Sequence, residues 1–203
     1  SAVRPNNRIL VIDTEQHFDH IGGNSYFREL GIDVFGHASI ERTREEFSAE
    51  LADFNAQISN PARRAAREAN VFYHRSSLAN PNCPIAKPMR FDLGGCDAEI
   101  LLTPGHTASN LFIWVPRDGV VFTGDCLANR YVPNLDCATV EGWRQWLDSL
   151  DRLASLAPGA VVPGHGPVAV GEDAPRLIEA VRSVIEQSIS SGFSPTMPNL
   201  TTA

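Results

Sequence analysis

Residues 14–23 read TEQHFDHIGG and place two imidazoles and two carboxylates within six positions, from Glu15 to His20. This polar stretch follows the apolar run ILVI of residues 9–12, which is typical of a buried strand. A short loop at the end of a buried strand can direct all four side chains to one point. Because imidazole nitrogens and carboxylate oxygens are ligands for divalent cations, the stretch predicts a metal site.

Three stretches downstream repeat this arrangement of an apolar run followed by a polar turn. They are TPGHT at 103–107, FTGD at 122–125 and PGHG at 163–166, and they contribute His106, Asp125 and His165. Four of the six histidines in the chain lie in these three stretches and the first one. One such turn alone would favour an exposed histidine without a role. Four of the same form predict that strand ends converge on one edge of a sheet.

The composition limits the class of protein. A chain of 203 residues with 43% hydrophobic content can build the core of one ordinary domain. No apolar run approaches the roughly 20 residues needed to span a membrane. A net charge of −7 with no basic cluster disfavours a nucleic-acid partner. The expected partner is a small-molecule substrate, with neither nucleic acid nor membrane. The sequence does not decide between a cytoplasmic and a periplasmic location.

The four cysteines do not form a metal-binding or redox motif. Cys83, Cys96, Cys126 and Cys137 include no CxxC pair, so neither a zinc finger nor a thioredoxin-like site is indicated. Cys126 adjoins Asp125, but we expect a small buried residue there rather than a ligand.

Strand patterns alternate with helix patterns along the chain. Short apolar runs predict strands at 8–13, 32–35, 89–93, 99–102, 110–115 and 120–122. Helical patterns cover 24–30, 40–68 with a break at Asn60-Pro61, 141–156 and 174–189, whereas 70–87 is predicted to be an irregular loop. The stripe that contains Trp143 and Trp146 is a predicted core face. These patterns together predict an α/β layered domain.

The four stretches, in this order, resemble the motifs of the metallo-β-lactamase superfamily. The resemblance covers about residues 8–170 and implies an αβ/βα four-layer sandwich with a binuclear metal site at the edge of two facing sheets. It implies zinc, or in some members iron or manganese. Carried over by position, His17 and His106 would bind the first metal, Asp19, His20 and His165 the second, and Asp125 both.

Two features depart from the superfamily pattern. Glu15 stands where members usually carry the first motif histidine, so it either binds the first metal through its carboxylate or turns away and leaves that site weak. Members also carry several strands before this motif. We therefore expect a domain at residues 1–190 that is truncated at its N-terminus, followed by a flexible tail at 191–203. A sheet with open edges predicts a homodimer or a strand-swapped oligomer.

The implied activity is metal-dependent hydrolysis. Two metals would hold a bridging hydroxide that attacks a carbonyl ester, lactone, thioester or β-lactam, while Asp19 orients it and carries a proton. Asn110, Tyr131 and Asn134 are candidate substrate contacts, although a structural role is the stronger expectation for each. Two alternatives remain at this point: a degenerate metal-binding module without catalysis, and an iron-dependent sulfur dioxygenase of the same superfamily.

Overall fold

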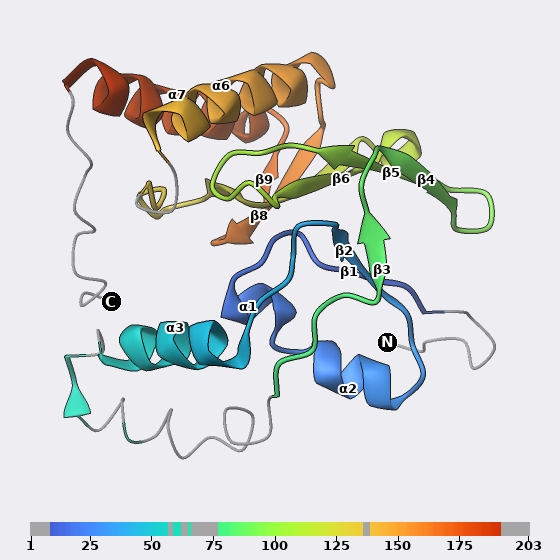
Figure 1. Ribbon diagram of the computed structural model, residues 1–203. Coiled ribbons are helices and arrows are strands. Elements are labelled where there is room, and N and C mark those ends of the chain that lie inside the picture. Colours follow the sequence, from blue (N-terminus) through green and yellow to red (C-terminus); the bar gives the residue numbers. More distant parts are fainter. Residues whose placement is uncertain (1–8, 57–58, 62–64, 66–76, 136–138, 192–203) are drawn as a thin grey trace.

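Two sheets face each other in the computed structural model, which describes residues 9–56, 59–61, 65, 77–135 and 139–191 (Figure 1). In this part of the chain the larger sheet has six strands in sequential order, β4 to β9, and the smaller sheet has three, in the order β1-β2-β3. Helices α6 and α7 cover the outer face of the larger sheet, and α1, α2 and α3 lie beyond the smaller one (Figure 1). The four-layer αβ/βα sandwich that the sequence predicted is therefore confirmed.

The first half of the described chain builds the smaller sheet and its helices. Its elements are β1 (Val11–Ile12), α1 (Phe18–Ile21), α2 (Asn24–Glu29), β2 (Val34–His37), α3 (Arg44–Ala56) and β3 (Cys83–Ile85). The three strands are parallel. Two predictions were wrong in this half: Phe18–Ile21 is a single helical turn rather than loop, and Cys83–Ile85 is a strand within the segment expected to be irregular.

The second half builds the larger sheet and its two long helices. Its elements are β4 (Met89–Asp92), β5 (Asp97–Leu102), β6 (Leu111–Val115), the 3-10 turn η1 (Pro116–Asp118), β7 (Val120–Ala128), α6 (Val140–Ser155), β8 (Ala160–His165), β9 (Ala169–Val170) and α7 (Asp173–Ser191). Helix α7 ends where the predicted tail begins, and residues 192–203 lie outside the described residues.

The amphipathic faces read from the sequence form the main core. Trp146, Leu150 and Leu153 of α6 are fully buried against the larger sheet and against α7. A second apolar cluster around Ile85, Ile100 and Leu111 fills the space between the two sheets. Apolar clusters cover both faces of the larger sheet and hold its strands in place. The loops at its edge are anchored to these strands. Within the described residues, no helix is long and apolar enough to cross a membrane.

Candidate metal centre

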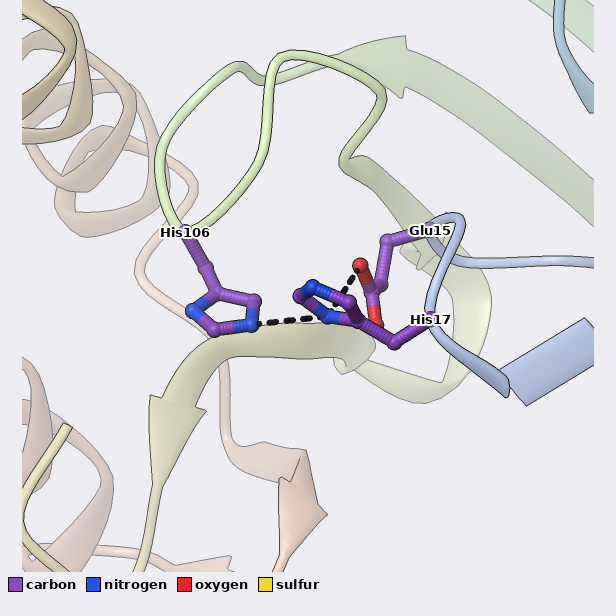
Figure 2. A group of neighbouring side chains, drawn as sticks. All are labelled: Glu15, His17 and His106. Atoms are coloured by element: carbon purple, nitrogen blue, oxygen red, sulfur yellow. Dashed lines mark hydrogen bonds and ion pairs between the residues drawn. The ribbon is translucent and has the colours of Figure 1, made fainter. Parts of the chain in front are cut away.

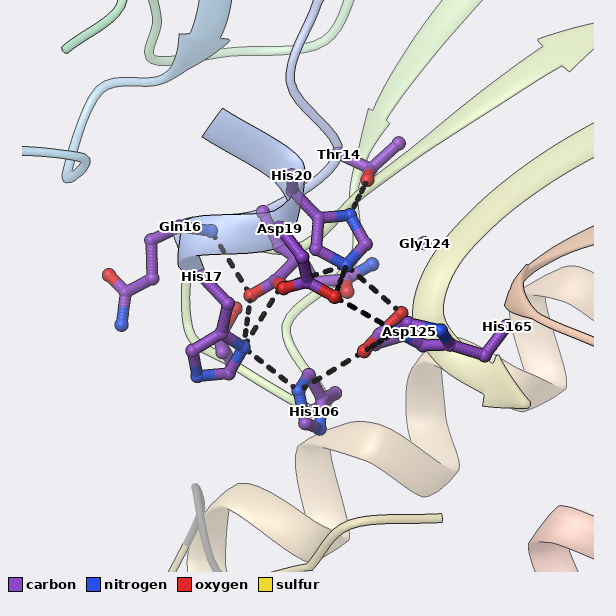
Figure 3. Close-up of polar contacts among 12 residues, drawn as sticks. Thr14, Gln16, His17, Asp19, His20, His106, Gly124, Asp125 and His165 are labelled. Carbon is purple, nitrogen blue, oxygen red and sulfur yellow. Dashed lines mark hydrogen bonds and ion pairs between the residues drawn. The ribbon is translucent and has the colours of Figure 1, made fainter. Parts of the chain in front are cut away.

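The four predicted stretches meet at one edge of the two sheets (Figure 3). The loop after β1 carries Glu15 and His17, and α1 carries Asp19 and His20. His106 follows β5. The other two residues differ from their predicted position in a turn: Asp125 lies within β7, next to a register irregularity at Gly124, and His165 is the last residue of β8.

A first group of ligand atoms comes from Glu15, His17 and His106 (Figure 2). Nδ1 of His17 lies 2.9 Å from Oε1 of Glu15 and 3.1 Å from Nε2 of His106. Glu15 has no exposed surface, and its carboxylate faces the two rings. Of the two orientations considered for Glu15, the inward one is therefore the one found.

A second group comes from Asp19, His20 and His165. Nε2 of His165 lies 3.1 Å from Oδ2 of Asp19, and Nε2 of His20 lies 3.8 Å from the same oxygen. This group is the more open one, because the side chain of His165 is 48% exposed and that of Asp19 35% exposed, against 0% for Glu15. A molecule arriving from solvent meets the second group first.

Asp125 lies between the two groups. Its Oδ2 is 3.3 Å from Nε2 of His165 and 3.8 Å from Nε2 of His106, while its Oδ1 is 3.2 Å from Nε2 of His20. A third possible ligand set therefore joins Glu15, His20 and Asp125. Gly164 allows this arrangement, because a Cβ at that position would collide with Oδ1 of Asp125.

Outer contacts aim the ring nitrogens into the cluster. Nδ1 of His20 lies 3.0 Å from Oγ1 of Thr14, and Nδ1 of His106 lies 3.0 Å from the carbonyl oxygen of Asn134. In both rings this leaves Nε2 directed at the carboxylates. Partners of this kind fix the orientation of metal-binding histidines in proteins. Thr14 was not singled out from the sequence, although it begins the first motif.

The charges of the cluster are strongly coupled. Burial raises the pKa of Asp125, but contacts with His165 and His20 outweigh it and hold that pKa well below its ordinary value. Burial lowers the pKa of His20, yet contact with Asp125 and the charge of Glu15 raise it to about 9. Hydrogen bonds to Asp125 and Asp19 raise the pKa of His165 to about 10. Any cation that takes these nitrogens must compete with protons.

The residues fit a divalent cation. Nε2 of His20 and Oδ1 of Asp125 are buried and face each other, and neither has an aligned hydrogen-bond partner among the described residues. Buried polar atoms without a well-aligned hydrogen bond are costly, and a cation between them would remove that cost. Mixed imidazole and carboxylate donors suit zinc, iron or manganese.

The three predicted substrate contacts differ in where their side chains lie relative to the centre. Asn110 is fully buried, and its Nδ2 donates to the carbonyl oxygens of Leu111 and Thr123, so this placement does not fit substrate contact. Asn134 acts on the centre through its main-chain oxygen on His106. Tyr131 is 50% exposed and its ring centroid lies 6.4 Å from that of His165.

Tyr131 also lines a groove to which none of the seven cluster residues contributes. The groove has a volume of about 490 Å³ and lies between residues 128–133 and the first turns of α7. Cys126, by contrast, is buried with its thiol 3.6 Å from the carbonyl oxygen of Thr103, as expected of a structural residue.

Comparison with known proteins places these motifs in one family. The sequence model of the Metallo-beta-lactamase superfamily matches residues 10–165. A beta-lactamase-like protein 2 homolog of Caenorhabditis elegans is 28% identical over 92 residues, which are 45% of this chain and 28% of that protein. A probable metallo-hydrolase of Streptococcus pyogenes is 27% identical over 171 residues, 78% of this chain and 64% of that protein.

A solved structure shows the same fold. A metallo-beta-lactamase family protein of Thermus thermophilus aligns with a TM-score of 0.67 at 22% identity, over 90% of this chain and 62% of that one. The chain thus spans less than two thirds of the length of each of these three proteins.

Proposed function

The chain belongs to the metallo-beta-lactamase superfamily, which consists mostly of metallo-hydrolases, and from this we propose that it is a divalent-metal-dependent hydrolase of carbonyl substrates. The substrate is an ester, lactone, thioester or β-lactam. One observation carries the proposal: seven ligand-type side chains from four separate stretches converge in one cluster, in which buried atoms of His20 and Asp125 have no aligned hydrogen bond.

The proposed metal ligands follow the groups in the cluster. Glu15, His17 and His106 hold one cation, Asp19, His20 and His165 hold the other, and Asp125 lies between them. When bound, such a cation polarises a carbonyl oxygen and lowers the pKa of a water molecule at its open position. Zinc is the expected ion, with iron or manganese as the substitutes that carboxylate donors favour.

Asp19 is the proposed carrier of the proton. Its carboxylate is 35% exposed, at the open side of the cluster, and lies 3.1 Å from Nε2 of His165. It can orient an attacking water and return the proton to the leaving group. Burial raises the pKa of Asp19, but the hydrogen bond from His165 and the charge of His20 outweigh it and hold that pKa below its ordinary value.

Tyr131 is the proposed substrate contact. Its half-exposed ring lies beside His165, where it would contact an acyl chain or ring of a substrate that reaches the cluster. Asn110 is not proposed again, because its side chain is enclosed between strands.

Metal titration combined with hydrolysis assays tests the function. The purified chain should bind up to two equivalents of zinc and hydrolyse a member of the ester, lactone, thioester or β-lactam series. His106→Ala should lose both properties, whereas His37→Asn, a histidine outside the cluster, should keep both. A chain that binds no zinc, manganese or iron, or that binds metal and hydrolyses none of these classes, would refute the proposal.

A further inference from the structure

Helix α3 brings a carboxylate to the outer side of the metal-binding loop. Oε1 of Glu50 lies 3.8 Å from Nε2 of His17, on the ring edge opposite the nitrogen that faces Glu15 and His106. The side chain of Glu50 is only 24% exposed. Nothing in the sequence motifs points to this residue, which lies 33 positions beyond His17 in a charged helical segment.

Packing of α3 on α1 holds this carboxylate in place. Phe47 of α3 is buried with Phe18 and Ile21 of α1, and the rings of Phe18 and Phe54 lie 5.1 Å apart. Glu50 lies three residues after Phe47 and four before Phe54, so it shares their face of the helix. The helix therefore presents Glu50 to the loop that carries His17.

Arg42 connects the same carboxylate to the loop backbone. Its Nη2 lies 2.8 Å from Oε2 of Glu50, and its Nη1 donates to the carbonyl oxygen of Gln16, the residue before His17, at 3.0 Å. Asn80 holds Arg42 in turn, by accepting from its main-chain nitrogen and donating to its main-chain oxygen. Arg42 is 13% exposed, so this bridge is partly shielded from water.

We propose that Glu50 is the positioning residue of His17. At 3.8 Å its charge favours the tautomer with the proton on Nε2, which leaves the lone pair on Nδ1, the nitrogen that faces Glu15 and His106. Carboxylates that accept a hydrogen bond from the far nitrogen of a histidine ligand raise its basicity and fix its ring. At 3.8 Å Glu50 lies beyond hydrogen-bond distance, so it acts on His17 through its charge. The inference rests on the proposed metal centre and adds a residue from a helix outside the four motifs.

Zinc affinity of charge-removing variants tests this role. Glu50→Gln keeps the size of the side chain and removes its charge, so zinc binding, measured by competition with a chromophoric chelator, should weaken about 10- to 100-fold. Glu46→Gln is the matched control. It lies one turn earlier on α3, its carboxylate lies 3.9 Å from Nε of Arg42, and it is the more exposed residue. It should leave zinc affinity unchanged.

A second readout separates positioning from packing. Urea unfolding of the zinc-free proteins measures the stability that Glu50→Gln loses with the Arg42 ion pair, and the zinc-induced increase in midpoint above each zinc-free value should shrink only in Glu50→Gln. In the zinc-loaded chain labelled with 15N, the Nε2 proton of His17 should exchange with water faster in Glu50→Gln. Unchanged zinc affinity in Glu50→Gln, with tight binding by the parent chain, would overturn this inference alone. A parent chain that binds no metal would overturn the proposed function together with it.

Discussion

Glu15 shows how one residue changes the chemistry expected of a shared motif. A histidine in that place would offer a neutral nitrogen, whereas Glu15 places a carboxylate beside His17 at 2.9 Å and beside His20 at 3.3 Å. The added negative charge favours harder cations and reduces the Lewis acidity of a cation held there. The sequence left the direction of this side chain open, because a motif specifies an order of residues and not a rotamer.

The first prediction concerns metal preference. Glu15→His should raise affinity for zinc relative to manganese by roughly tenfold or more, because an imidazole replaces a hard oxygen donor. Competition between the two ions for the purified chain measures the ratio. An unchanged ratio would mean that Glu15 does not bind the cation. Glu45→His, on the charged start of α3, is the control for adding a histidine.

The second prediction concerns His37, a histidine outside the cluster. Burial lowers its pKa below the ordinary value of 6.5, and its Nδ1 accepts from the main-chain nitrogen of Ser39 at 3.1 Å. The unfolded chain therefore takes up this proton at a higher pH than the folded one. His37 should therefore contribute its full stabilisation above pH 6.5, the pKa of the unfolded chain. This contribution should be lost as the pH falls from 6.5 through the lower pKa of the folded chain.

Unfolding by urea between pH 7.5 and 5.5 measures this effect. His37→Asn keeps an acceptor for Ser39 without a titrating group, so its unfolding free energy should fall less steeply with acid than that of the parent chain. If the unfolding free energies of the two proteins fall in parallel with pH, His37 does not contribute to the pH dependence of stability.

At the level of elements, the sequence predicted long regular segments better than short ones. The helical stripe of α6 and the hairpin strand β6 were recognised because their side-chain periodicity persists over several residues. Of β7 only residues 120–122 were predicted, and the strand continues to Ala128 where a turn was expected. The turn α1 and the strand β3 were missed, since four and three residues are too few to show a period. Whether these short segments become helix or strand depends on tertiary contacts, which the local sequence pattern does not reveal.

The same limit explains which parts of the centre could be read in advance. The ligands follow apolar runs and so could be placed at a sheet edge. Glu50 and Arg42 lie in a charged segment that looks like a solvated helix face, and only the packing of Phe47 against α1 turns that face inward. A residue that contacts the centre from a separate helix or loop cannot be recognised from the sequence around it.

The third prediction concerns the helix behind His106. Trp146 of α6 is fully buried, its Nε1 donates to the carbonyl oxygen of Cys126 at 3.0 Å, and its ring lies 5.9 Å from that of His106. Trp146→Phe removes the donor and leaves a buried carbonyl unpaired, which should cost about 1–3 kcal/mol of unfolding free energy. It should also weaken zinc binding.

Trp143 provides the matched comparison. Its Nε1 also donates to a buried carbonyl oxygen, that of Leu135, at 3.0 Å. Trp143→Phe should therefore lower the unfolding free energy by a similar amount. It should change the zinc affinity of the correctly folded chain less than Trp146→Phe does, because Leu135 adjoins Asn134, whose carbonyl oxygen contacts His106. Equal zinc affinities for the two variants would refute a supporting role of Trp146 for His106.

At the scale of the whole molecule, alternation of strands and helices predicted an α/β layered domain, and the resemblance to the superfamily implied its four layers. Neither predicted the sizes of the sheets. In the described chain the smaller sheet has three strands, and β1 at its edge is only two residues long. Ile9, just before β1, is 46% exposed. Among the described residues, no strand pairs with the outer side of β1, and an edge strand of this kind favours pairing with another strand.

The fourth prediction follows from that edge. The chain should form a homodimer, or a strand-exchanged oligomer, whose population rises with protein concentration in light-scattering measurements after gel filtration. Ile9→Lys should shift the equilibrium toward monomer, because a charge at a sheet edge opposes strand addition. A parent chain that is monomeric at every concentration would contradict this proposal.

The arrangement of ligands around a shared site is the claim on which the function depends. Crystals of the chain soaked with zinc, measured at the zinc absorption edge, would locate bound ions directly through their anomalous scattering. The account predicts one peak among Glu15, His17 and His106 and a second among Asp19, His20 and His165, with Asp125 between them. The absence of any peak within this cluster, in crystals that bind zinc elsewhere, would contradict it.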